Sequence, residues 1–358
     1  MRRQAGLAPG LLLGSVLDAL LADPRRAHPV AAFGTAASRA ENRLWAASRA
    51  RGALFALACA GPAAALGWGL QRLARHDPVR LAGVTAVTAW TVLGGASLAA
   101  EAAAMSRALT AGDLDGARAR LPALCGRDPA GLPAAELARA TVESVAENTC
   151  DAVVAPLLWG AAFGLPGLFG YRAVNTLDAM VGHKTMRYAK FGWAAARADD
   201  LANFIPARVT ALLTVALAPV AGGSGRAALR ALRRDGGAHP SPNAGRCEAA
   251  FAGALGVQLG GTNVYRGHAE RRGALGDGPP PAPEDIDRAI RLSRSVTVTA
   301  TLLAAAIAHA RNASGACMPR FPHAPGARVP GSSGVRFMIQ KDFRLHGGDN
   351  PSRSRKGR

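Results

Sequence analysis

Three acidic residues spaced for one face of a helix are the first residues in this chain whose types and spacing could do chemistry. Glu143, Glu147 and Asp151 stand at positions i, i+4 and i+8, so a helix would align their carboxylates, with Asn148 beside them. Like charges at this spacing repel, and a Mg²⁺ ion bridging to phosphate would compensate them, because Mg²⁺ takes carboxylate and phosphate oxygens as ligands. A solvated acidic helix face answered by nearby arginines has the same spacing, so both interpretations stay open.

A second polar block alternates acids, amides and cations. Asn175 and Asp178 stand one helical turn apart, and two adjacent acids, Asp199 and Asp200, precede Asn203. The segment GHKTMRYAKFGW between them supplies three cations, Lys184, Arg187 and Lys190. Such alternation favours a metal-phosphate site, because phosphate needs cationic partners and a metal needs anionic ones. Interfacial salt bridges with snorkelling Lys and Arg side chains would give a similar composition.

A third polar stretch, HPSPNAGRCEAAFAGALGVQLGG, combines His239, Asn243 and Glu248 with the pair Gly260 and Gly261. Pro and Gly at this density favour loops of fixed shape, which binding loops often require. A lone histidine such as His239 is more often structural than catalytic. The sequence has no P-loop, GxSxG, HExxH or GxGxxG motif, so a nucleotide would be held in some other way.

Uncharged runs flank and join these polar blocks. They cover residues 52–71, 81–100, 152–171 and 209–225, with shorter runs at 295–310 and 4–17. Crossing a bilayer takes about 20 largely apolar residues, within a range of roughly 17 to 25, so the first four runs are long enough and the last two are marginal. Two of them, 81–100 and 152–171, lack the polar face that a helix of a large soluble all-helical protein would show. We therefore predict an all-α, polytopic integral membrane protein with four to six spans and helical cytoplasmic loops.

The run 152–171 raises a problem of sidedness. If it crossed the membrane once, the polar blocks before and after it would face opposite compartments and could not share a site. It contains Pro156, Gly160, Gly164, Pro166, Gly167 and Gly170, which weaken a single straight helix. We expect a re-entrant segment that returns both blocks to one face, an arrangement that is tolerated where such backbone is buried in protein.

The two ends of the chain differ in character. The N-terminus has the basic start and apolar stretch of a signal peptide, but Asp18 and Asp23 stand where small cleavage-site residues would be needed, so we expect it to be retained. Residues 1–311 are expected to form the membrane-embedded domain. Residues 312–358 carry nine Lys and Arg against two Asp and lack helical periodicity, which predicts a disordered basic tail.

Net charge and cysteine spacing limit the classes of binding partner that we expect. The formal net charge is +19, and basic loops beside membrane spans are expected on the cytoplasmic side, where they attract anionic lipid of the bilayer. No aromatic platform or zinc spacing accompanies the charge, so we expect no nucleic acid partner. The five cysteines form no CxxC pair, which argues against a disulfide framework or a zinc site.

Four long motifs resemble the adenosylcobinamide-phosphate synthases of cobalamin biosynthesis. They are DALLADPRRAHPVAAFG, ESVAENTCDAVVAPL, YRAVNTLDAMVGHKTMRYAKFGWAAARADDLANFIPARVTALL and HPSPNAGRCEAAFAGALGVQLGG, and they are spread in order over about residues 9–310. The resemblance implies a multi-pass enzyme of the cell membrane with its active face in the cytoplasm. One departure is His183, where members of the family often have an aromatic residue, and it affects a local contact but not the class.

The resemblance also implies the reaction. Such an enzyme is an ATP-dependent carboxylate-amine ligase that joins aminopropanol, or its phosphate, through an amide to a propionate of the corrinoid adenosylcobyric acid. Chemically, amide formation of this kind needs an activated carboxylate, a metal ion and cations at the transferring phosphoryl group, and a base that frees the amine. Mg²⁺ and the co-substrate ATP are the expected cofactors, and association with other enzymes of the corrinoid pathway is an expected partnership.

The roles of individual residues are hypotheses. We assign the metal to Glu143, Glu147 and Asp151; catalysis to Asp199 and Asp200 as base or metal ligands and to Lys184 and Arg187 as phosphate partners; and substrate binding to Asn148, Asn175, Asp178, Asn203, His239 and Asn243. The main alternative is a non-catalytic corrinoid-binding or transport protein, although a secondary transporter would be expected to show inverted repeats, and none is evident. A membrane protein that recruits soluble enzymes through basic loops would need no acidic helix face.

Overall fold

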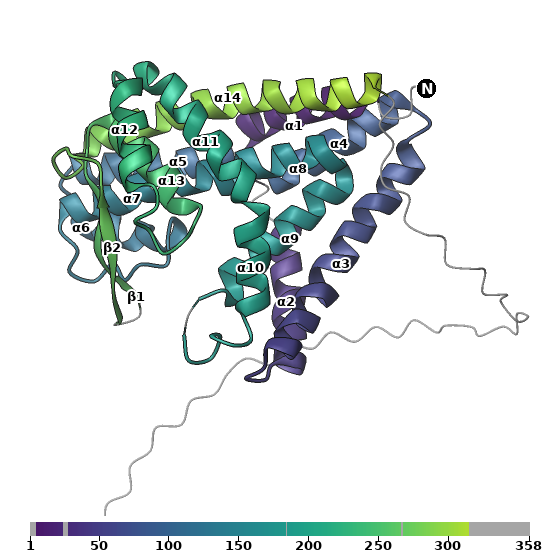
Figure 1. Cartoon of the computed structure of the whole chain (residues 1–358), viewed down its shortest axis with the longest axis horizontal. Helices are drawn as coiled ribbons and strands as arrows, with labels where there is room; N and C mark the ends of the chain where they lie inside the picture. Colours follow the sequence, from purple (N-terminus) through teal and green to yellow (C-terminus); the bar gives the residue numbers. More distant parts are fainter. Residues whose placement is uncertain (1–4, 24–27, 184, 266–267, 315–358) are drawn as a thin grey trace, which may run out of the picture. The chain divides into compact units, whose positions relative to one another are not determined.

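Helices make up most of the residues that the structure describes, which confirms the all-α prediction. The computed structural model describes residues 5–23, 28–183, 185–265 and 268–314, and all of them belong to one compact unit (Figure 1). The first half contains α1 (Leu7–Leu21), α2 (Pro29–Leu44), α3 (Arg49–Ala74), α4 (Pro78–Val92), α5 (Gly95–Thr110), α6 (Leu114–Arg120), the 3₁₀ turn η1 (Leu121–Ala123) and α7 (Ala134–Thr149).

The second half completes the unit and includes a two-stranded hairpin. It contains the π turn η2 (Cys150–Val154), α8 (Ala155–Phe163), α9 (Leu165–Val181), α10 (Trp193–Ala202), α11 (Phe204–Leu217), the 3₁₀ turn η3 (Ala218–Ala221), α12 (Gly225–Asp235), α13 (Ala244–Leu255), β1 (Leu259–Tyr265), β2 (His268–Leu275) and α14 (Pro283–Ala313). The Pro-rich stretch before α14 places Pro283 in the first turn of that helix, where the missing N–H costs nothing.

Four stretches of helix are long and apolar enough to cross a membrane, at the lower end of the predicted range. They are Arg49–Ala74, Pro78–Thr110, Phe204–Ala221 and Pro283–Ala313. Only 11% of the apolar window in Arg49–Ala74 is buried inside the protein, so this helix, α3, presents apolar side chains outward over most of its surface. An outward apolar surface of that length is suited to lipid, as expected of a membrane protein.

The run 152–171, predicted to be long enough to span, is divided at Gly164. This residue has φ 72°, a left-handed conformation that favours glycine, and it ends α8 and precedes α9. The buried Gln71 of α3 fixes the turn, because its Oε1 accepts the Leu165 N–H at 2.8 Å. A Cβ at Gly167 would lie 2.1 Å from the Trp159 carbonyl oxygen, so glycine there lets α9 approach α8 closely. The marginal run 295–310 instead forms part of the 31-residue helix α14.

A proline accounts for the π turn that precedes α8. Pro156 has no N–H to donate to the helix ladder, and its ring opposes the carbonyl of residue i−4. The Ala152 carbonyl instead accepts the Gly94 N–H at 3.2 Å, and the Asp151 carbonyl lies 3.1 Å from the Tyr171 hydroxyl, which donates to it. Glu143 and Glu147 are therefore on one regular helix, α7, whereas Asp151 lies in the π turn that follows it.

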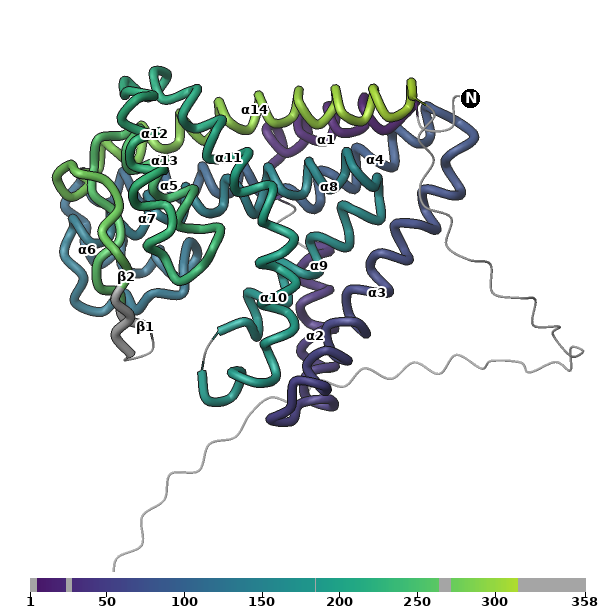
Figure 2. Tube along the Cα trace, in the orientation of Figure 1, coloured from purple at the N-terminus to yellow at the C-terminus, as the bar shows by residue number. Residues whose placement is uncertain are grey.

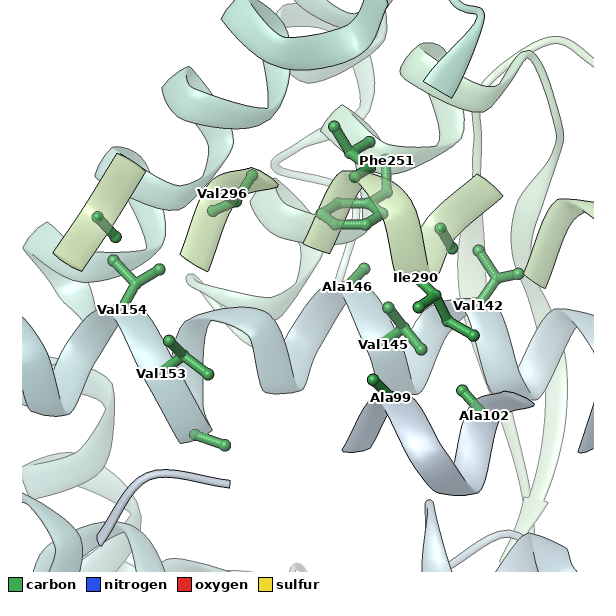
Figure 3. Packing of buried hydrophobic residues seen from close by; sticks show 14 of the residues in the cluster. Ala99, Ala102, Val142, Val145, Ala146, Val153, Val154, Phe251, Ile290 and Val296 are labelled. Atoms are coloured by element: carbon green, nitrogen blue, oxygen red, sulfur yellow. The ribbon is translucent and has the colours of Figure 1, made fainter. Parts of the chain in front are cut away.

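Small side chains dominate the core around α7 and α14. Figure 3 shows Ala99 and Ala102 of α5, Val142, Val145 and Ala146 of α7, Val153 and Val154 of η2, Phe251 of α13, and Ile290 and Val296 of α14 packed together. Alanine at so many contacts allows helix backbones to approach closely, as in other membrane helix bundles. This packing fixes α7, the helix that carries two of the predicted site residues.

The β-hairpin is the element that the sequence did not predict. Strands β1 and β2 pair antiparallel, with Gly261 opposite Arg272 and Asn263 opposite Glu270, and a register shift lies between Leu259 and Gly261. Gly260 and Gly261 have φ of 81° and 92° and therefore belong to this irregular strand instead of the predicted loop. Glycine is needed at position 260, where a Cβ would lie 2.0 Å from the Gly273 carbonyl oxygen.

Lys184 and nearly all of the predicted basic tail, residues 315–358, lie outside the described residues. Residues 312 and 313, which the sequence analysis placed in the tail, form the end of α14. That 152–171 enters a membrane and returns stays a prediction. The structure has the bend itself, and the bend places the two polar blocks next to each other.

Candidate functional site

Carboxylates from the first two polar blocks meet at one amide. Asn175 of α9 donates through Nδ2 to Asp151 Oδ2 of the π turn at 3.4 Å and to Asp199 Oδ1 of α10 at 3.3 Å. Asp178 lies one turn after Asn175 on α9. We call Glu147, Asp151, Asp178 and Asp199 the carboxylate cluster.

Two further buried side chains fix Asp199. Asn203, at the junction of α10 and α11, donates from Nδ2 to Asp199 Oδ2 at 3.0 Å, and its Oδ1 lies 2.8 Å from the Tyr171 hydroxyl. Asn203 is 1% exposed and Tyr171 3%. Both oxygens of Asp199 thus accept an amide N–H, so the orientation of this carboxylate is set before any ligand binds.

Burial and mutual repulsion raise the pKa of every carboxyl in the cluster. Desolvation is the main cause in each case. For Asp178 burial, followed by the neighbouring charges of Asp199, Asp200 and Glu147, raises the pKa to about 7. For Glu147 burial raises the pKa, while the Arg272 guanidinium partly offsets it. A site in this condition favours a cation, a shared proton or both.

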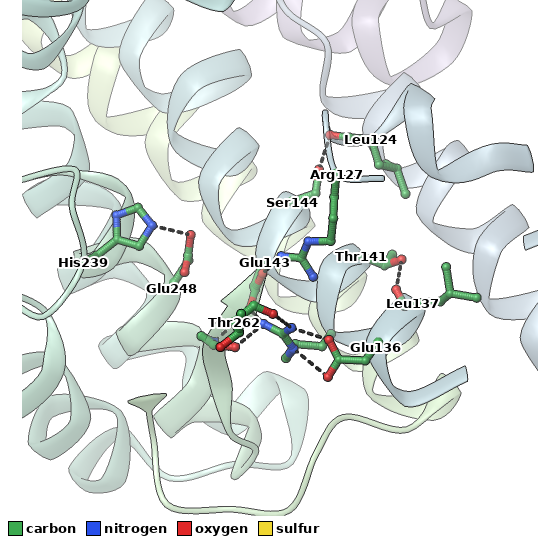
Figure 4. A network of polar contacts seen from close by, with 12 residues as sticks. Leu124, Arg127, Glu136, Leu137, Thr141, Glu143, Ser144, His239, Glu248 and Thr262 are labelled. Carbon is green, nitrogen blue, oxygen red and sulfur yellow. Dashed lines mark hydrogen bonds and ion pairs between the residues drawn. The ribbon is translucent and has the colours of Figure 1, made fainter. Parts of the chain in front are cut away.

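Glu143 does not join this cluster. Its Oε1 accepts Arg139 Nη1 at 3.0 Å and the Gly260 N–H at 2.8 Å, and its Oε2 accepts Arg127 Nη2, all in the interior (Figure 4). Arg139 also pairs with Glu136. The alternative to a metal site is an acidic helix face paired with arginines. Glu143 is paired with arginines in this way, although the pairing is buried instead of solvated. We call Arg127, Glu136, Arg139 and Glu143 the arginine-glutamate network.

No three His, Cys, Asp or Glu side chains in the described part of the chain lie close enough together to hold a metal ion by themselves. The predicted trio of Glu143, Glu147 and Asp151 is thus not a ready three-ligand site, because the two arginines occupy Glu143. Mg²⁺ commonly uses only one or two carboxylates and completes its shell with phosphate oxygens and water. The pair Asp151 and Asp199, linked by one amide, offers that smaller donor set.

The remaining predicted amides lie around the cluster with protein partners of their own. Asn148 donates back to the Ser144 carbonyl at 3.0 Å, and Asn243 donates to the Asp200 carbonyl at 2.7 Å. The Asp200 carboxylate pairs with Arg197 at 3.2 Å on the more exposed side of α10. Through Asn243, the third polar stretch is thus joined to α10.

His239 belongs to a different pair. Its Nδ1 accepts the Ser241 N–H at 2.9 Å, and its Nε2 lies 3.8 Å from Glu248 Oε1 (Figure 4). Glu248 is fully buried, and burial, followed by the charges of Glu143 and Glu147, raises its pKa well above the usual range. His239 therefore lies beside the arginine-glutamate network.

Arg187, predicted to bind phosphate, has its contacts elsewhere. It pairs with Glu41 of α2 at 3.0 Å and its guanidinium lies 4.7 Å from the centre of the Trp45 ring. Within the described residues, its side chain contacts Glu41, Trp45 and Tyr188 and no member of the carboxylate cluster. Its role as a phosphate partner stays a prediction.

Four residues beside the site were not assigned from the sequence. Tyr171 and Arg172 end the apolar run, and Arg172 lies 3.4 Å from Asn175 Oδ1 through its Nη1. Their place three and four residues before Asn175, on the same helix face, is a signal that could have found them. Arg272 lies on the hairpin and Glu248 on α13, and no local spacing in the sequence points to either residue.

The fold and the site together define a helical membrane protein with a buried acidic site between its apolar helices. The family model described as CobD/Cbib protein matches residues 11–293, and this chain belongs to that family of cobalamin biosynthesis. It is 50% identical over 305 residues to Cobalamin biosynthesis protein CobD of Mycobacterium tuberculosis (strain ATCC 25618 / H37Rv), covering 85% of this chain and 96% of that protein.

Proteins of the same name in other bacteria are similar over most of their length. The identity is 49% over 272 residues in Geobacter metallireducens, covering 75% of this chain and 86% of the relative. It is 42% over 290 residues in Rhodobacter capsulatus, covering 79% and 90%. No solved structure matches this chain. The predicted family is thereby confirmed, together with a role in cobalamin biosynthesis that implies corrinoid-related substrates.

Proposed function

We propose that this chain is an ATP-dependent amide synthase that joins aminopropanol, or its phosphate, to a propionate carboxylate of adenosylcobyric acid. The product is adenosylcobinamide or its phosphate. The observation that carries the proposal is the carboxylate cluster, in which Asp151 of η2 and Asp199 of α10 both accept hydrogen bonds from Asn175 of α9. We place the enzyme in the cell membrane with this cluster at the cytoplasmic face, where ATP is available.

The reaction has two steps. The substrate carboxylate oxygen attacks the γ-phosphorus of ATP, so that a C–O–P bond forms and ADP leaves. The amine then attacks the acyl carbon, phosphate leaves with the C–O electron pair, and one amine proton must be removed. Asp178 is suited to accept that proton, because a carboxylate whose pKa is about 7 is both ionised and basic near neutral pH.

The donor chemistry of the cluster fits Mg²⁺. Asp151 and Asp199 are hard oxygen donors that both accept from the amide NH₂ group of Asn175, and both carboxyl groups have raised pKa values because burial and neighbouring acids disfavour their charge. We assign Asp151 and Asp199 as the residues that would hold the ion, with Glu147 beside them. Bound Mg²⁺ would supply positive charge for the phosphate oxygens of ATP.

Amides around the cluster have the chemistry to orient substrate. The corrinoid carries several amide side chains; Asn148 is a half-buried amide of α7, and the buried amide of Asn243 lies against the Asp200 carbonyl of α10. Asn175 and Asn203 instead act on the protein's own acids, Asp151 and Asp199. We therefore reassign these two from substrate binding to positioning.

The decisive experiment is ATP-dependent coupling of adenosylcobyric acid to aminopropanol or its phosphate by detergent-purified protein, with product detected by mass spectrometry. Wild type is expected to form product, and Asp199→Asn is expected to lose at least about a hundredfold in rate, because it removes one of the two carboxylates assigned to the metal ion. Asp115→Asn, at an exposed acid that pairs with Arg118, is the matched control and should retain full activity. Folded wild type that forms no product with either amine would favour a corrinoid-binding or transport role.

A further inference from the structure

Polar side chains that the proposed reaction does not use are buried between the hairpin, α7 and α13. Arg127 is 4% exposed, Asn263 1% and Glu248 0%. Within the described part of the chain, Arg127 Nε and Nη1, both amide atoms of Asn263 and both carboxylate oxygens of Glu248 have no hydrogen-bond partner. Buried polar groups are nearly always hydrogen-bonded, because leaving one unmade costs free energy of folding. Three such side chains in one region therefore call for a ligand.

The register of the hairpin places Asn263 on the same face as Arg272, the face that is turned toward α7. Because Gly261 pairs with Arg272 and Asn263 with Glu270, Asn263 and Arg272 lie on the same face of the hairpin. A Cβ on Gly261 would lie 3.9 Å from Arg139 Nη1, so this face is directed at α7. Glu248 of α13 is close enough to Arg272 and Arg127 for both guanidinium groups to lower its pKa, against the larger effect of burial.

The chemistry of this region is that of a donor-rich, water-poor site. Arg127 and Arg272 supply guanidinium N–H groups and Asn263 supplies an amide N–H. Of the acids beside them, Glu143 is already paired with Arg127 and Arg139, and Glu248 is fully buried with His239 Nε2 at 3.8 Å from its Oε1. A phosphoryl group, with three strong acceptor oxygens, is the small-molecule group that such donors recognise best.

We propose that Arg127, Asn263 and Arg272 form a binding site for the phosphoryl group of a small-molecule ligand. The site borders the carboxylate cluster, since Arg272 acts on Glu147 as well as on Glu248. The inference rests on the proposed function only for the choice of ligand, which is either ATP or the phosphorylated amino alcohol. Both carry the same phosphoryl chemistry, and the test distinguishes them.

The test measures binding by isothermal titration calorimetry with the detergent-purified full chain. One arm uses a non-hydrolysable ATP analogue with adenosine as its phosphate-free counterpart, and the other uses aminopropanol phosphate with aminopropanol. The main variant is Asn263→Leu, which removes the unpartnered amide at nearly constant volume. We expect the affinity for one of the two phosphorylated ligands to fall about tenfold, which corresponds to the loss of one good hydrogen bond, while the phosphate-free counterpart is unaffected.

A stability measurement accompanies binding. If Asn263 serves a ligand, Asn263→Leu should raise the Tm of the ligand-free protein while weakening phosphate binding, because an unpaired buried amide is replaced by an apolar side chain. Arg127→Gln should weaken binding of the same ligand, and Arg120→Gln is its matched control, since Arg120 is exposed and pairs with Glu101. Loss of binding in Arg127→Gln counts only where its Tm shows a folded protein.

Three outcomes decide the matter. Affinity that falls for the ATP analogue alone assigns the site to the nucleotide, and affinity that falls for the amine phosphate alone assigns it to the second substrate. Unchanged affinity for both ligands in Asn263→Leu, with a raised Tm, would overturn the inference and leave a hydrated polar interior. Amide synthesis by wild type is scored separately, so an active enzyme with unchanged binding refutes the phosphate site alone, and weakened binding without synthesis refutes the proposed function alone.

Discussion

Asp178 is the carboxyl group through which pH should control the reaction. Its pKa is raised to about 7 by burial and by Asp199, Asp200 and Glu147, so it is protonated at pH 6 and ionised at pH 8. If it accepts the amine proton, kcat/KM rises with pH along a limb with an apparent pKa near 7. Asp178→Asn should lose that limb and most of its activity, whereas Asp115→Asn should keep it. A limb that survives in Asp178→Asn would assign the titration to another group.

The same residue predicts how stability depends on pH. The pKa of Asp178 is raised from 3.8 to about 7 on folding, so the unfolded state releases this proton first and stability falls as pH rises between these values. The cost is absent below pH 3.8 and complete above pH 7, with an upper limit of about 4 kcal/mol. Asp178→Asn should therefore match wild type in Tm at pH 4 and exceed it at pH 8. Thermal unfolding in detergent at both pH values checks the sign.

Glu143 should act on stability, because it lies between two buried arginines. Glu143→Gln leaves Arg127 and Arg139 without their shared anion, and breaking a buried pair in this way costs about 3–5 kcal/mol. The exposed pair of Asp115 and Arg118 is worth about 1 kcal/mol at most, so Asp115→Asn should barely change the Tm. If Glu143→Gln kept wild-type stability but lost its response to Mg²⁺, the original metal assignment would regain support.

The bend between α8 and α9 places the two polar blocks next to each other. Gly164→Ala would place a Cβ at φ 72° and 2.2 Å from Gln71 Oε1, so it combines backbone strain with a clash. We expect a loss of more than about 1 kcal/mol together with lower activity, because the bend sets Asn175 against Asp151. Gly34→Ala, in a helix with nothing near the new Cβ, is the control and should be neutral or stabilising. Thermal unfolding and the coupling assay on both variants measure the difference.

Some of these elements could be predicted from the sequence and others could not. The apolar runs predicted the helices, and the breakers Pro156 and Gly164 predicted that 152–171 is not one straight helix, because these effects are local. The pairing of Glu143 depends on Arg127, 16 positions earlier, and on Gly260, 117 positions later, which no helical spacing reveals. The hairpin was missed because LGGTNVY has two adjacent glycines where an alternating strand pattern would be expected. Long-range pairings thus separated the predicted site from the observed one.

The candidate spans predict which segments of the chain face each side of the membrane. Pro78–Thr110 is a single candidate span, so the turn at His76 and the exposed residue Asp115 should face opposite compartments. Asp115 belongs to α6, which lies on the same side as α7, α12 and α13 (Figure 2); none of these four helices is a candidate span, and we place this side in the cytoplasm. In intact cells a membrane-impermeant maleimide should label His76→Cys and spare Asp115→Cys, and inverted vesicles should reverse the pattern. Peptide mass spectrometry separates these sites from the native cysteines, and the opposite pattern would refute a cytoplasmic site.

The proline at position 156 shows a trade-off between heat resistance and turnover. An alanine there would restore the N–H that the Ala152 carbonyl lacks and allow an unbroken helix, a change of the kind that commonly makes proteins sturdier. It would also release Gly94 and Tyr171 from the two carbonyls that they now occupy and turn the Asp151 side chain about the helix axis, away from Asn175. Selection for heat resistance alone would therefore be expected to erase this residue, and selection for turnover to keep it.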